Sequence, residues 1–162
     1  MTLQEQRVQK PPYERLSALV LSGGAKERLD RFIGQVQSMK LKPKWYATNA
    51  YNVKYRGKMI FRFTMNAEQN TVSLFFTISD VAGIDAVLEP LPEGMKQFYF
   101  DHFRACTHCN PAHSGRKVTV LGRDCVCCAE PEMRVDDPTD AEYGMLLRFV
   151  PVRKEKIVAG VA

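Results

Sequence analysis

The chain has 162 residues, of which 45% are hydrophobic and 25% are charged, a composition typical of a globular protein rather than a disordered one. No apolar run approaches the length of about 18 residues that a membrane span needs, and the polar first ten residues lack the apolar core of a signal peptide. We therefore expect neither a membrane span nor a secretion signal. The net charge of +5 is uneven, because residues 1–60 carry 12 Lys/Arg against 4 Asp/Glu.

Two helices are predicted near the start of the chain. They follow a polar segment of about ten residues that we expect to be frayed. The first helix covers residues 12–21, where Tyr13, Leu16 and Val20 recur at helical spacing. Two glycines break it, and the second helix covers residues 25–41.

A pattern of period two then predicts three antiparallel strands. Apolar side chains alternate with polar ones over residues 45–56, 59–66 and 71–78, and Gly57 marks a tight turn between the first two segments. Three consecutive segments agree in this pattern. We expect a meander with one apolar face and one largely polar face.

Two helices are predicted after the meander. Asp80 is placed to cap a short one, and Pro92 suits the first turn of the next, which extends to about Arg104. His102 lies on the apolar face of that helix. We expect it to be a hydrogen-bonded core histidine rather than a catalytic one.

The last part of the chain is predicted to contain an acidic loop over residues 130–137 and then a helix opened by Asp137-Pro138 and closed by Pro151. Residues 153–156 are expected to form a solvated tail. The predicted fold class is α+β, with a three-stranded antiparallel meander packed against helices. We expect a single domain over residues 1–162, with a small cysteine hairpin inserted before the C-terminal helix.

All five cysteines fall within 23 residues. Cys106 and Cys109 form one C-x2-C pair, Cys125 and Cys128 form a second, and 15 residues separate the pairs. This spacing is typical of a four-cysteine zinc site. Two thiolates on a tight turn can point at one ion, and two such turns brought together by a hairpin complete a tetrahedron. Residues 117–121 are predicted as a strand that leads to the second pair.

Residues 106–128 resemble the zinc-ribbon type of metal-binding hairpin, and the resemblance covers this segment rather than the whole chain. The segment lacks the glycine that often follows the second cysteine of each pair, and Cys127 is a surplus thiol within the second pair. Cys127, His108 or His113 could therefore replace one of the four ligands. Four sulfurs suit either zinc or an iron–sulfur cluster, and short paired turns on a hairpin favour zinc.

The ligand count decides what such a site can do. With four cysteine ligands no coordination position is open, so the zinc is structural and its binding energy stabilises the hairpin. Cys127 is then either an inert thiol or, beside the metal, an acidified thiol that could sense oxidants. If one cysteine does not ligate, a bound water could make the metal a Lewis-acid catalyst. Because five is an odd number and no secretion signal is seen, the cysteines fit a cytoplasmic protein better than a disulfide framework.

The remaining chemistry points to binding rather than catalysis. The chain has no HExxH or GxSxG motif, so we expect a non-enzymatic protein. Basic and aromatic residues are predicted on the sheet and could contact nucleic acid or a small ligand: Lys54, Arg56, Lys58, Arg62, Tyr46 and Trp45. An open sheet face also accumulates cations for solubility alone, and nucleic acid is the less favoured partner. The main expectation is a structural zinc site that supports a surface for a protein or small-molecule ligand, and a redox- or effector-sensing module is the alternative.

Overall fold

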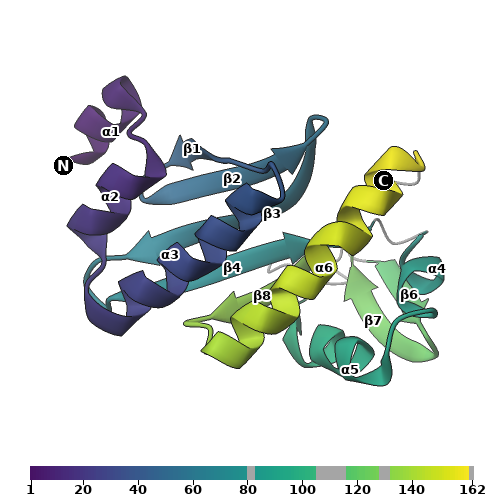
Figure 1. Ribbon diagram of the computed structural model, residues 1–162. Coiled ribbons are helices and arrows are strands. Elements are labelled where there is room, and N and C mark those ends of the chain that lie inside the picture. Colours follow the sequence, from purple (N-terminus) through teal and green to yellow (C-terminus); the bar gives the residue numbers. More distant parts are fainter. Residues whose placement is uncertain (80–82, 105–115, 128–131, 161–162) are drawn as a thin grey trace.

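The computed structural model of the protein, shown in Figure 1, describes residues 1–79, 83–104, 116–127 and 132–160. The helices in this part of the chain are α1 (Leu3–Gln9), α2 (Tyr13–Val20), α3 (Gly23–Ser38), α4 (Ile84–Leu88), α5 (Glu93–His102) and α6 (Asp140–Val158). The strands are β1 (Pro43–Ala47), β2 (Ala50–Tyr55), β3 (Lys58–Asn66), β4 (Thr71–Thr77), β5 (Phe103–Arg104), β6 (Arg116–Val120), β7 (Arg123–Cys127) and β8 (Glu132–Asp136).

The predicted α+β fold class is confirmed, and the sheet is larger than predicted. Its six strands lie in the order β1-β2-β3-β4-β8-β5, every neighbouring pair is antiparallel, and β6 and β7 form a separate hairpin. The predicted first strand is in fact two, because the chain turns at Asn49, whose φ of 52° lies in the left-handed region. The segment predicted as an acidic loop contains β8, which pairs with β4. Its Met133 and Val135 are buried, so the segment does follow the period-two pattern.

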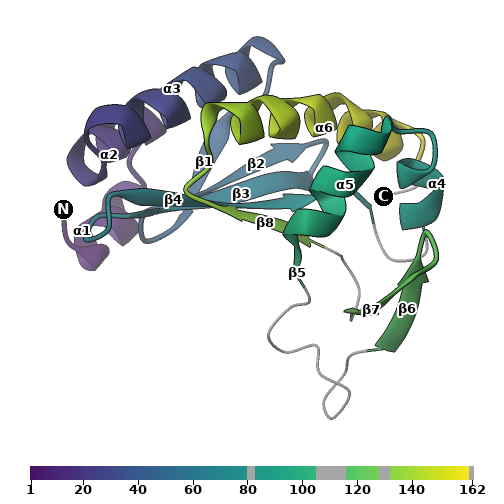
Figure 2. The same cartoon turned by 90° about the horizontal axis from the view of Figure 1, so that it is seen from below.

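The apolar face of the meander is the core, as the alternation predicted. Phe61, Phe63 and Phe76 are fully buried there, and the rings of Phe61 and Phe76 stack with centroids 5.6 Å apart. Helices α3 and α6 lie side by side over this face, as Figure 2 shows, and Phe32 of α3 packs 5.3 Å from Phe61. In the same view, none of the helices that the structure describes covers the opposite face of β2, β3 and β4, which we call the open face.

The helices that were predicted around the sheet are confirmed, with boundaries that shift by a few residues. Helix α5 ends at His102, two residues before the predicted end, because Phe103 and Arg104 pair with β8 as strand β5. Pro92 is the residue that precedes the helix rather than a member of its first turn. Asp80, the predicted cap of the short helix, lies outside the described residues.

The first ten residues are not frayed, contrary to the prediction. They form α1, which begins with a capping box in which Thr2 and Glu5 bond each other's backbone amides. Gln6 is buried and holds this helix against the β1–β2 turn. Its amide nitrogen donates to Asn49 Oδ1 over 2.9 Å, and its Oε1 accepts the Asn49 backbone N–H, also over 2.9 Å.

The C-terminal helix does not stop at Pro151, and the tail predicted after it is helical. Helix α6 begins with a capping box between Thr139 and Glu142 and continues through Pro151 to Val158. Arg153 is only 3% exposed, and it donates from Nε to the carbonyl oxygen of Met59 over 3.0 Å. Burial of this last turn offsets the backbone hydrogen bond that a proline cannot make.

Candidate functional site

The cysteine segment is described in part, and that part is a hairpin. The strand predicted over residues 117–121 is confirmed as β6, which pairs with β7 in the register Arg116↔Cys127, Val118↔Cys125 and Val120↔Arg123. Cys125 and Cys127 thus occupy alternate positions of one strand. The other candidate ligands, and with them the tight turns expected at both cysteine pairs, lie wholly or partly outside the described residues: Cys106, His108, Cys109, His113 and Cys128.

The turn of this hairpin consists of Leu121 and Gly122, whose φ angles of 45° and 77° are both positive. Two successive positive φ values are the signature of a type I′ turn, which matches the twist of the flanking strands. Glycine adopts this backbone conformation without strain at the second position. This turn was not predicted, although Gly122, which lies between two short strand-like segments, is the residue that marks it in the sequence.

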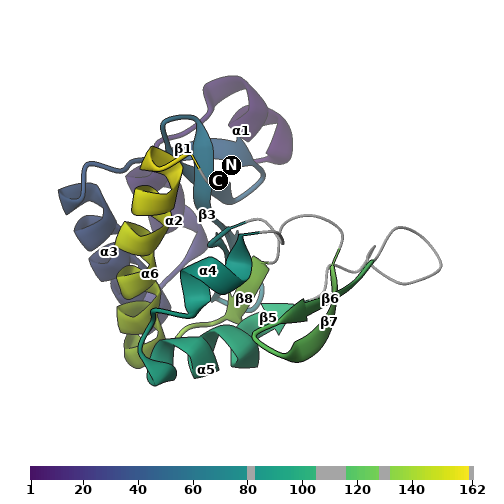
Figure 3. The same cartoon turned by 90° about the vertical axis from the view of Figure 1, so that its right-hand side faces the viewer.

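The turn is fixed to the body of the protein. The backbone N–H of Leu121 donates to Asp85 Oδ1 of α4 over 3.0 Å, Val120 is buried in the main core, and the guanidinium of Arg123 lies 4.0 Å from the ring centre of Phe100 in α5. Figure 3 shows the hairpin beside α4 and α5. Asp85 of α4 thus anchors the hairpin turn. Of the described cysteines, Cys127 lies at the end of the hairpin opposite to these contacts, and Cys125 lies in the middle of β7.

No group of three or more Cys, His, Asp or Glu that could hold a metal occurs among the described residues.

His102, which was expected to be satisfied by hydrogen bonds, is partly buried, with Nδ1 2.9 Å from the Phe98 carbonyl oxygen and Nε2 3.3 Å from Glu142 Oε1. Burial alone would raise the pKa of Glu142. Hydrogen bonds from the backbone and side chain of Thr139 and from His102 outweigh burial and hold this pKa below its usual value of 4.5.

A second candidate site is the open face of the sheet. The register places Lys44, Asn52, Arg62, Phe75 and Arg134 in one row across five strands. The guanidinium of Arg62 lies 4.6 Å from the ring centre of Phe75, and that of Arg134 lies 5.4 Å from it. Phe75 is therefore a half-buried aromatic ring with two cations against it.

Carboxylates balance both of these arginines. Arg62 pairs with Glu132 over 3.1 Å, and Arg134 pairs with Asp136 over 3.0 Å. Sequence reasoning found Arg62 and missed its partner on β8, because that segment was taken for a loop. The centre of the open face is thus close to electrically neutral.

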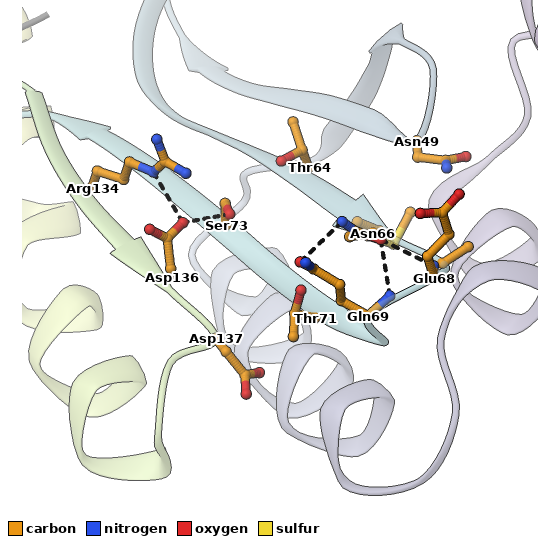
Figure 4. Close-up of a pocket in the computed structure, with 12 residues that line it drawn as sticks. Asn49, Thr64, Asn66, Glu68, Gln69, Thr71, Ser73, Arg134, Asp136 and Asp137 are labelled. Carbon is orange, nitrogen blue, oxygen red and sulfur yellow. Dashed lines mark hydrogen bonds and ion pairs between the residues drawn. The ribbon is translucent and has the colours of Figure 1, made fainter. Parts of the chain in front are cut away.

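A groove of about 720 Å³ opens on this face, at the end where β3 turns into β4. Its side chains are mostly amides, hydroxyls and carboxylates, and Figure 4 shows Asp136 between Arg134 and Ser73, with Ser73 Oγ donating to the carboxylate over 2.5 Å. The labelled lining residues in that view are Asn49, Thr64, Asn66, Glu68, Gln69, Thr71, Ser73, Arg134, Asp136 and Asp137. A groove of this composition could take a polar ligand by hydrogen bonding.

The residues that the sequence assigned to one binding surface lie in different parts of the structure. Lys54, Arg56 and Lys58 are exposed and lie together at the turn between β2 and β3. Tyr46 is 57% exposed. Trp45 pairs with buried Tyr51 and packs against the core, so it lies on the covered side of the sheet.

Comparison with known proteins adds no relative. No protein-family model matches the chain, and neither a curated protein nor a solved structure matches it. Within the described part of the chain, no helix has the length and apolar character that crossing a membrane requires.

Proposed function

We propose that the protein is a non-enzymatic zinc-binding protein in which a structural site of Cys106, Cys109, Cys125 and Cys128 stabilises the hairpin segment. The observation that carries the proposal is the pair of C-x2-C motifs separated by 15 residues, the second of which begins on strand β7. Because thiolate ligands must stay reduced, the proposal places the protein in the cytoplasm.

The hairpin supports this proposal through its attachment. Its turn is held by α4 and α5, whereas the pair of Arg116 and Cys127 forms the end of the ladder that is remote from those contacts. A two-stranded hairpin is marginally stable on its own in water, so the end remote from the anchor needs another source of stability. A tetrahedral zinc site supplies it, because metal binding to such a site is folding free energy for the segment.

The surface that this arrangement serves is the open face of the sheet. The groove beside Ser73 and Asp136 and the row of side chains around Phe75 both lie there. We propose that this face binds a ligand or a partner, while the zinc itself takes no part in chemistry.

Metal analysis of the purified, reduced protein tests the proposal. We expect one zinc ion per chain by mass spectrometry and four thiols that react only after chelation, leaving Cys127 as the reactive fifth thiol. Changing any one of the four proposed ligands to serine should lower the zinc content, whereas the matched variant Cys127→Ser should retain it. Metal-free protein with an unchanged fold would contradict the proposal. Visible absorption from bound iron would show that the site holds an iron–sulfur cluster instead of zinc.

A further inference from the structure

One end of the sheet carries cations without carboxylates. Residues 31–67 contain eight Lys/Arg and no Asp or Glu. Two of the eight form ion pairs with distant residues: Arg31 with Asp140, and Arg62 with Glu132. The other six and one lysine of α6 form what we call the basic end: Lys40, Lys42, Lys44, Lys54, Arg56, Lys58 and Lys154. None of these seven has a described carboxylate within ion-pair distance.

The fold brings these cations together. Pro43 pairs with Val53, so Lys42 and Lys54 flank the end of the same β1–β2 ladder. The guanidinium of Arg56, next to the β2–β3 turn, lies 5.6 Å from the ring centre of Tyr55.

Lys154 joins this group from α6. Its Nζ lies 4.9 Å from the ring centre of Tyr55, and it donates to the carbonyl oxygen of Met39 over 3.2 Å. That contact fixes the last turn of α6 beside Lys40, and Figure 1 shows the C-terminal half of α6 next to the β2–β3 turn. Described carboxylates near this region include Glu155, next to Lys154, and Glu14, which accepts from Gln37 Nε2 over 3.2 Å.

We propose that the basic end binds the phosphate backbone of single-stranded nucleic acid. Seven clustered cations with so little compensating negative charge attract a polyanion, and binding releases the counterions that surround it. None of these residues belongs to the cysteine hairpin, so the proposal goes beyond the zinc site and does not depend on it.

Aromatic and guanidinium groups next to the basic end favour a single strand. Tyr46 is the unpaired residue of a β-bulge in β1, two positions from Lys44, and its ring is 57% exposed. The row that starts at Lys44 leads across the open face to Arg62, whose guanidinium already lies against the half-buried ring of Phe75, so Tyr46 is the ring in this row's neighbourhood that is exposed. Exposed aromatic rings and guanidinium planes bind unpaired bases by stacking, which a duplex does not permit.

A membrane surface fits the basic end less well. Binding to a bilayer combines cations with large apolar side chains that enter the headgroup layer. Most exposed side chains of that kind, Leu3 and Val8 of α1 and Leu19 of α2, belong to helices at the other end of the sheet in Figure 1, and Val158 at the end of α6 is the exception.

Fluorescence anisotropy with a labelled oligothymidylate tests this proposal on the full, zinc-loaded chain. We expect the logarithm of the affinity to fall linearly with the logarithm of the salt concentration, with a slope of about −3 if roughly four phosphates are neutralised. The triple variant Lys54→Glu, Arg56→Glu, Lys58→Glu should bind at least about tenfold more weakly and show a shallower slope.

A matched control carries the same change of charge at exposed positions elsewhere: Arg7→Glu, Arg15→Glu and Arg148→Glu. It should retain most of the affinity, and thermal melts should show that both triple variants are folded. Tyr46→Ala should weaken binding to oligothymidylate by about tenfold and leave binding to inorganic polyphosphate unchanged, because only the oligonucleotide has bases to stack.

Three results would overturn the proposal: no binding at low salt, an equal loss of affinity in both triple variants, or tighter binding to anionic lipid vesicles than to the oligonucleotide. The zinc proposal is judged separately. If oligonucleotide binding survives chelation, the nucleic-acid proposal is supported whatever the metal content. If the protein contains zinc but does not bind the oligonucleotide, only the nucleic-acid proposal is contradicted.

Discussion

Arg153 shows how a residue predicted to lie in solvent can be part of the core. Its guanidinium donates to the carbonyl oxygens of Met59 and Ile78, each over 3.0 Å, and so joins α6 to the ends of β3 and β4. The sequence Arg-Lys-Glu-Lys resembles a solvated face, and the helical spacing of its first residue from Val150 and Ile157 was lost once Pro151 was taken as the end of the helix. Its long-range contacts place it in the core.

The variant Arg153→Met tests this interpretation. It keeps a long apolar side chain and leaves two buried carbonyl oxygens without their charged donor, so we expect unfolding to cost about 2–3 kcal/mol less free energy. Urea denaturation followed by circular dichroism measures the loss. The exposed Arg148→Met serves as the control and should change stability by less than about 0.5 kcal/mol. Equal effects of the two changes would mean that the buried hydrogen bonds contribute nothing.

Glu142 contributes stability that depends on pH. Its folded-state pKa is lowered, so its contribution is fully present above the usual carboxyl pKa of 4.5 and is lost as the pH falls through the lowered value. Glu142→Gln should therefore reduce the melting temperature at pH 6 and flatten its decline in acid. Melting curves from pH 6 to about pH 3 measure this. Glu155→Gln on the same helix is the control, and an acid decline that is identical in wild type and Glu142→Gln would contradict the assignment.

At the scale of elements, the sequence predicted the pieces whose patterns are local. Helices α2, α3 and α5 and the apolar face of β2, β3 and β4 follow from spacing and breakers. The errors lie where tertiary contacts override a local signal. The hydrogen bonds of Gln6 stabilise α1, and pairing with β4 makes β8 a strand. Helix α6 continues past Pro151 because the residues that follow are partly buried.

The candidate sites show the same limit. The cysteine spacing and strand β6 could be read from the chain, because both are short-range patterns. The placement of Asp85 under the hairpin turn and of Arg134 against Phe75 could not, since each depends on residues more than 30 positions apart. The predicted zinc ligands, and the predicted single domain with its insert, remain predictions.

The attachment of the β6–β7 turn can be tested by itself. Asp85→Ala removes the acceptor of the Leu121 N–H, which should make hydrogen exchange at that amide faster by about fivefold or more, as expected for the loss of roughly 1 kcal/mol. Asp101→Ala in α5 removes an exposed carboxylate that bonds only Gln97 among the described residues, and it should leave exchange at Leu121 unchanged. Slow exchange in Asp85→Ala would show that Val120 and Arg123 hold the turn without it.

At the scale of the whole molecule, the proposed zinc site would give the cysteine segment a source of stability separate from that of the sheet core. The core consists of buried aromatic and aliphatic side chains from helices α2 to α6, from the sheet and, in the hairpin, from Val120. Val120, next to the anchored turn of the hairpin, belongs to this core, whereas Cys127 lies at the far end of the β6–β7 ladder. Loss of zinc should therefore affect one segment and spare the rest.

Removal of zinc by a chelator should leave the amide signals of β2, β3 and β4 in place and change those of β6 and β7. The metal's binding free energy belongs to the segment that it folds. Two-dimensional NMR of the reduced protein before and after chelation shows this directly, and readdition of zinc should restore the spectrum. Collapse of the whole spectrum would mean that the core depends on the metal, contrary to this account.

The coordination of the metal is the most direct test of the central claim. X-ray absorption at the zinc edge of the purified, reduced protein should give a single shell of four sulfur atoms at about 2.3 Å. A shell that contains nitrogen or oxygen ligands at about 2.0–2.1 Å would mean that a histidine or a water completes the site. That result, or a protein without zinc, would contradict a structural site of four cysteines.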